Sequence, residues 1–112
     1  MKDCKVNVLG MEYSIVIADE SEDKLLVGAD GYCDKTTKRI GIHTEGKSCE
    51  LGCFEVYQKK VLRHEIIHAF MFESGIAENF EHKQFGQEET LVDWIAIQFP
   101  KMLEAFKQAD CL

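Results

Sequence analysis

The apolar pattern of this chain changes once, near Phe54, and that change restricts the possible folds. Before it, β-branched and aromatic residues form short strand-like runs, and after it the apolar residues recur at helical spacing. At 112 residues the chain is long enough for one modest core and too short for two. Strands first and helices second, around one core, predict a single α+β domain spanning residues 1–112, with a small antiparallel sheet packed on two helices.

Two hairpins are predicted in the first half of the chain. Residues 4–9 and 12–18 are strand-like runs on either side of a glycine-containing turn. Residues 31–34 and 38–43 flank the polar turn 35–37 in the same way. We therefore expect four strands.

The second half predicts two long helices. The first runs over residues 54–74 and is followed by Gly75, which can end a helix in the left-handed conformation. Residues 75–87 read as an irregular connection, and the second helix begins near residue 87 or 88. Pro100 either kinks this helix or begins a new helical segment.

Charge and cysteine content exclude some classes of function. The 13 basic and 20 acidic residues give a formal charge of −7, which disfavours nucleic acid and anionic membranes as partners. Five cysteines are an odd number, and the first ten residues show no secretory signal, so we expect reduced thiols and a cytoplasmic protein. No apolar stretch reaches the length of a membrane span. Oligomeric state cannot be predicted.

The first helix carries the pattern His64-Glu65-x-x-His68. Residues four apart lie one turn apart on the same helix face, so both imidazoles can bind one metal ion. Glu65 lies at the edge of that face, where it can reach a water without binding the metal. This arrangement favours two zinc ligands with a neighbouring general base.

A hydrolytic zinc site needs a third protein ligand and one open position. Glu89 and Asp93 lie four apart on the second helix, so one carboxylate can bind the metal while the other orients a ligand histidine. Glu88 is the competing ligand, but it points about 100° away and has Val92, not an acid, four residues on. We therefore favour Glu89.

Together, the two helix motifs resemble those of the gluzincin metallopeptidases, in which a His-Glu-x-x-His helix is followed by a helix bearing Glu-x-x-x-Asp. The runs LRHEIIHAF and EETLVDWIAIQFPK look like small bacterial and prophage members related to the ImmA/IrrE-type metallopeptidases. The resemblance implies a zincin-like domain that binds one Zn²⁺ through His64, His68 and Glu89. It implies Glu65 as the catalytic base and Asp93 as the residue that orients a ligand histidine.

The same resemblance implies hydrolysis of peptide bonds in a peptide or protein substrate, such as a specific regulator of a mobile element. A donor for the oxyanion is not evident in the sequence, and Tyr32, His43 and His82 are the candidates. The predicted strand near residues 39–43 could offer an edge to which an extended peptide adds.

Two alternatives belong to other classes. Cys49, Cys53, His64 and His68 come close to the spacing of a structural Cys2His2 zinc site. The second alternative is a catalytically silent metal-binding module that recognises a partner protein. The intact Glu65 favours the enzyme, because a purely structural site has no need of that carboxylate.

Overall fold

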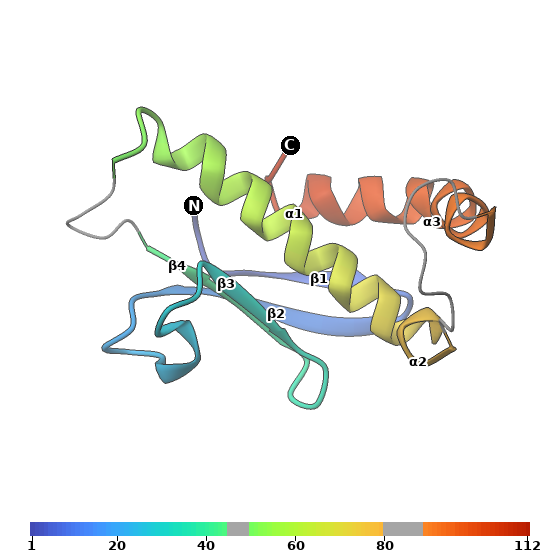
Figure 1. Cartoon of the computed structure of the whole chain (residues 1–112), viewed down its shortest axis with the longest axis horizontal. Coiled ribbons are helices and arrows are strands. Elements are labelled where there is room, and N and C mark those ends of the chain that lie inside the picture. Colours follow the sequence, from blue (N-terminus) through green and yellow to red (C-terminus); the bar gives the residue numbers. More distant parts are fainter. Residues whose placement is uncertain (45–49, 80–88) are drawn as a thin grey trace.

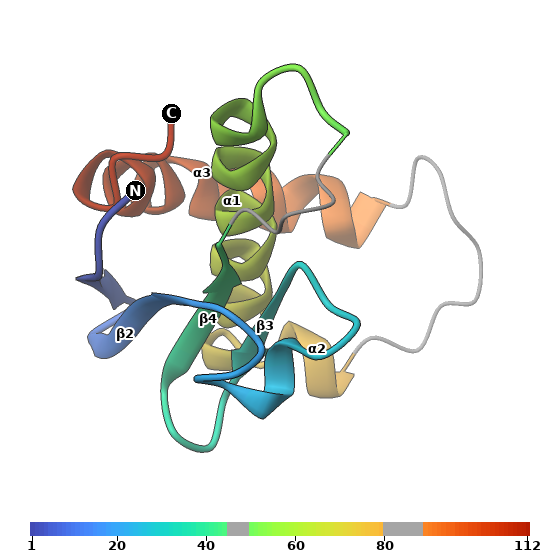
Figure 2. The ribbon, with the colours of Figure 1, turned by 90° about the vertical axis from the view of Figure 1, so that its left-hand side faces the viewer.

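The computed structural model describes residues 1–44, 50–79 and 89–112, and it has an α+β fold with two long helices on one face of a four-stranded sheet (Figure 1, Figure 2). The order of the strands across the sheet is β1-β2-β4-β3. Their bounds are Cys4–Val8 for β1, Met11–Ala18 for β2, Gly31–Asp34 for β3 and Arg39–His43 for β4. The predicted α+β class is confirmed.

Both predicted hairpins are present, but the sheet is mixed and not antiparallel throughout. β1 pairs antiparallel with β2, and β3 pairs antiparallel with β4. The two hairpins join through β2 and β4, which run parallel with Ser14 opposite Arg39. Parallel neighbours need a long crossover, and here the connection contains a short 3-10 helix, η1 (Lys24–Leu26), and β3 itself. The expectation of a purely antiparallel sheet is therefore wrong.

The first hairpin turns at Leu9 and Gly10, one residue before the turn at Gly10 and Met11 that the predicted strand runs leave. Both residues have positive φ, 52° and 91°, as in the type I′ turns that match the twist of two-residue hairpins. The Asn7 side chain supports the turn, because its Oδ1 accepts a hydrogen bond from the Gly10 N–H at 2.8 Å. Leucine is an unusual residue at a position of positive φ, so the sequence pattern did not predict the turn at Leu9.

The first long helix, α1 (Phe54–Glu73), ends where its sequence predicts. Gly75 follows the C-cap with φ of 83° and donates its N–H to the Phe72 carbonyl. A short helix, α2 (Ile76–Asn79), then begins the connection that was expected to be irregular. The last helix, α3 (Glu89–Gln108), contains Pro100, and its ribbon changes direction along its length (Figure 1). Within the described residues, no helix is both long and apolar enough to cross a membrane.

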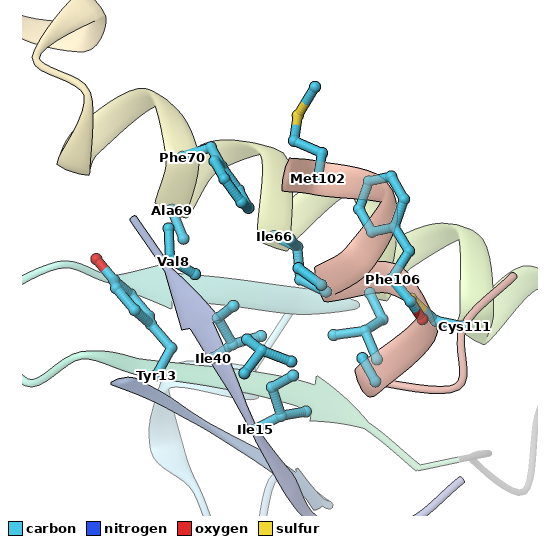
Figure 3. Packing of buried hydrophobic residues seen from close by; sticks show 14 of the residues in the cluster. Val8, Tyr13, Ile15, Ile40, Ile66, Ala69, Phe70, Met102, Phe106 and Cys111 are labelled. Carbon is cyan, nitrogen blue, oxygen red and sulfur yellow. The ribbon is translucent and has the colours of Figure 1, made fainter. Parts of the chain in front are cut away.

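The core lies between the sheet and the two long helices, which pack on the same sheet face (Figure 3). α1 lies over β3 and β4, and α3 lies over β1. Arg63 on α1 donates a hydrogen bond of 2.6 Å to the Cys111 carbonyl, which ties the end of the chain to the outer side of α1. The core residues that Figure 3 labels are Val8, Tyr13, Ile15, Ile40, Ile66, Ala69, Phe70, Met102, Phe106 and Cys111.

Candidate metal centre

His64 and His68 lie one turn apart near the middle of α1, and their imidazoles face each other. Their Nε2 atoms are 3.0 Å apart, and the two rings meet edge to face with centroids 4.7 Å apart. Two nitrogens that bind one tetrahedral zinc at about 2.0–2.1 Å lie about 3.3 Å from each other. The pair therefore fits a shared metal ion with only a small change in side-chain position.

Phe72 and Lys35 extend this cluster along the same face of α1. The Phe72 ring stacks on His68 with a centroid distance of 6.3 Å, and Lys35 Nζ lies 5.2 Å from the centre of the Phe72 ring. Lys35 is also paired with Glu78 of α2 at 2.6 Å. Sequence analysis missed Phe72, although its spacing of four residues from His68 is a signal for a shared helix face.

The electrostatic environment of His68 favours its neutral form. Burial lowers the pKa of His68, and the neighbouring His64 lowers it further. Metal binding requires an imidazole with a free nitrogen lone pair, so a lowered pKa helps the ring to act as a ligand near neutral pH.

Glu65 points to the buried side of α1 and not to solvent. It is 8% exposed, and within the described residues its carboxylate accepts no hydrogen bond. Burial raises the pKa of Glu65, and the nearby His64 partly opposes that rise. Cys33 of β3 lies close enough to interact with Glu65. Burial is the larger cause, and the charge of Glu65 the next, of the rise in the pKa of the Cys33 thiol to about 12. A buried carboxylate to which no described residue donates a hydrogen bond is available for proton transfer.

Glu89 and Asp93 lie in the first two turns of α3, but their side chains are outside the described part of the structure. The N-terminal half of α3 is held near the end of α1, because Trp94 Nε1 donates a hydrogen bond of 2.9 Å to Ser74 Oγ. Among the side chains that the structure does describe, no group of three or more His, Cys, Asp or Glu could hold a metal ion. The third ligand thus stays a prediction.

The two proposed oxyanion donors that the structure describes, Tyr32 and His43, have hydrogen-bond partners other than the histidine pair. Tyr32 lies on the sheet face opposite α1, packed over Gly41, where its hydroxyl donates to Asp23 at 2.6 Å and accepts from Arg39 at 3.0 Å. Tyr32 is therefore not placed to act as an oxyanion donor at the histidine pair. Successive side chains of a strand point to opposite faces of the sheet, so Tyr32 faces away from α1 because the adjacent Cys33 faces it. His43 is the last residue of β4, and its Nδ1 is paired with the Thr44 carbonyl. His82 lies outside the described residues.

β3, and not β4, forms the edge of the sheet beside α1. β4 pairs with both β2 and β3, so the edge expected near residues 39–43 is already occupied on both sides. β3 pairs only with β4 in the described structure. It packs closely on α1, since a Cβ added at Gly31 would lie 2.9 Å from Val61 Cγ1. The edge strand therefore runs beside the helix that carries the histidines.

The Cys2His2 alternative does not fit this structure. Cys53 is an exposed residue at the N-cap of α1, and His64 lies on the same continuous helix eleven residues later. Eleven residues of helix span about 16 Å, whereas two ligands of one zinc are separated by less than about 5 Å. Cys53 and the histidines therefore cannot share one ion, and Cys49 lies outside the described residues.

In comparisons with known proteins, no family model, no curated protein and no solved structure matched the chain.

Proposed function

We propose that this protein is a zinc-dependent metallopeptidase that binds one Zn²⁺ through His64, His68 and Glu89. The observation that carries the proposal is the pair of Nε2 atoms 3.0 Å apart, next to the buried carboxylate of Glu65. Two imidazoles spaced for one ion, with an adjacent carboxylate to which no described residue donates a hydrogen bond, suit a hydrolytic site better than a structural one.

Each residue has a distinct task in this proposal. His64 and His68 hold the ion, and the stack of Phe72 on His68 fixes one of the two rings. Bound zinc would supply Lewis acidity toward the scissile carbonyl and toward water. Glu65 accepts the proton of the attacking water and delivers it to the leaving nitrogen. Asp93 is proposed to accept a hydrogen bond from a ligand histidine, which would fix its orientation.

The proposed substrate is a peptide or protein segment in extended form. The free side of β3 offers backbone N–H and C=O groups to which such a segment can add as a fifth strand. A segment held there would lie beside the face of α1 that carries His64 and His68. The chain as a whole is acidic, which favours protein segments over nucleic acid.

Zinc content tests the ligand set. We expect about one zinc per wild-type chain, and loss of most of it in His64→Ala and in Glu89→Ala. His43→Ala and Glu88→Ala are matched controls that remove the same chemical groups elsewhere and should keep the metal. Elemental analysis of the folded proteins measures this, and full zinc retention in Glu89→Ala would exclude that ligand.

Peptidase assays test the role of Glu65. Glu65→Gln keeps both histidines, so we expect it to retain zinc but to cleave denatured casein at least about 100-fold more slowly than wild type. Glu55→Gln changes an exposed carboxylate on the same helix and should leave the rate unchanged. If wild type holds zinc but cleaves no better than Glu65→Gln, the protein is a binding module and not an enzyme.

A further inference from the structure

A cavity lies beside the first turns of α1, on the same side of that helix as the histidine pair. Its volume is about 490 Å³, within the range of pockets that hold small ligands. The lining comes from the segment around η1, the end of β4 and the start of α1. Tyr57 and Val61 contribute from α1, and they lie about two turns and one turn before His64 on nearly the same face.

The floor of this cavity is apolar. Leu26, Ile42 and Val61 line it, and all three are buried in the core, at 6% exposure or less. Such a floor suits the aliphatic part of a long side chain, because contact with it removes apolar surface from water.

The rim of the cavity is acidic. Glu20, Asp30 and Glu50 are exposed and line it, and no lysine or arginine is among the lining residues of the described structure. Tyr57 donates its hydroxyl to Asp30, which holds that carboxylate in place at the mouth. The rim therefore attracts a positive charge at the end of a bound group.

The side-chain amide of Gln58 adds a further acceptor to the lining of the cavity. Gln58 is 8% exposed, and its Nε2 donates a hydrogen bond of 3.1 Å to the His43 carbonyl. Its Oε1 accepts no hydrogen bond from any described residue, although the side chain lines the cavity. An amide oxygen that no described residue engages can accept a hydrogen bond from a donor brought by a ligand.

We propose that this cavity is a specificity subsite for a substrate side chain that is long, aliphatic and cationic at its end, namely arginine or lysine. The inference rests on the proposed peptidase function. Along α1, Val61 and Tyr57 lie about 4.5 and 10.5 Å before His64. An extended peptide advances about 3.3 Å per residue, so the occupant is the second or third residue from the cleaved bond.

Binding of single amino-acid derivatives tests the cavity without catalysis. We expect Nα-acetyl-arginine amide to shift the backbone NMR resonances of Gly28, Ala29 and Thr44 at lower concentration than Nα-acetyl-norleucine amide, and Nα-acetyl-glutamate amide to shift them least. The double variant Glu20→Gln/Asp30→Asn should weaken arginine binding about fivefold. The double variant Glu12→Gln/Glu104→Gln changes the net charge equally at distant positions and should not.

Cleavage of denatured casein then tests whether the cavity acts on substrates. Mass spectrometry of the products should show arginine or lysine enriched at one fixed position within three residues of the cleaved bond, and Glu20→Gln/Asp30→Asn should reduce that enrichment. Equal binding of the arginine and norleucine derivatives, or enrichment unchanged in the double variant, would overturn the inference. Arginine binding without any cleavage would instead reject the peptidase function and leave a cation-binding cavity in place.

Discussion

Glu73, at the end of α1, shows how one carboxylate links helix and sheet. It accepts a hydrogen bond of 2.7 Å from the Tyr13 hydroxyl of β2 and pairs with Lys38, which precedes β4. Burial alone would raise the pKa of Glu73, but the hydrogen bonds from Lys38 and Tyr13 outweigh it and lower the pKa. The same contact raises the pKa of Tyr13, after the larger effect of burial. The ionised form of Glu73 is thus the one that the fold stabilises.

Acid should therefore weaken this link. A pKa lowered on folding gives stability that is complete above the unfolded value, near 4.5, and is lost as the pH falls through the folded value. We expect Glu73→Gln to lower the free energy of unfolding by about 1 kcal/mol at pH 7 and by much less at pH 3. Urea denaturation at both pH values measures this. Glu55→Gln is the exposed control, and an equal loss in both variants would contradict the assignment.

The strands, turns and helix ends differ in how well their local sequence predicts them. The hairpins and the end of α1 at Gly75 were predicted because turn residues and helical spacing act within a few residues. The parallel pairing of β2 with β4 was not, because it depends on contacts between distant residues that no local pattern encodes. The histidine pair follows from helical spacing, whereas the burial of Glu65 depends on how α1 docks on the sheet. The edge position of β3 depends on the distant pairing of β2 with β4.

Gly75 at the end of α1 contributes to the stability of the fold. Gly75 has φ of 83°, a conformation that costs an L-residue with a Cβ about 1–2 kcal/mol. We expect Gly75→Ala to lower the free energy of unfolding by about that amount, and Gly75→Asn to lower it less, because asparagine tolerates this conformation better. Gly52→Ala, where an added Cβ meets no atom within 4 Å, is the control. Equal stability of Gly75→Ala and wild type would show that the cap is not needed.

At the scale of the whole molecule, the core does not depend on the proposed metal. The buried cluster joins β1, β2 and β4 to α1 and α3, and neither histidine belongs to it. We therefore expect the fold to persist without the metal, unlike small zinc domains that unfold when the metal is removed. Metal binding should add stability to a fold that already exists.

Chelation tests this independence. We expect EDTA to leave the far-UV circular dichroism spectrum unchanged, while saturating zinc raises the melting temperature by roughly 10 °C at a free concentration about 100 times Kd. Cys53→Ser should show the same zinc-dependent rise, since Cys53 is exposed and remote from the histidines along α1. Unfolding on chelation, or loss of the rise in Cys53→Ser, would point back to a structural zinc site.

The parallel contact between β2 and β4 also determines how this chain can reach its native state. Each hairpin closes over a short loop and can form early, whereas Ser14 meets Arg39 only after the intervening segment, including β3, has been ordered. Joining the hairpins is therefore the step with the highest entropic barrier. Until it occurs, the facing edges of β2 and β4 are both unpaired, and another chain can bind them. The half-folded protein, in which this pairing has not yet formed, is thus the state most prone to aggregate.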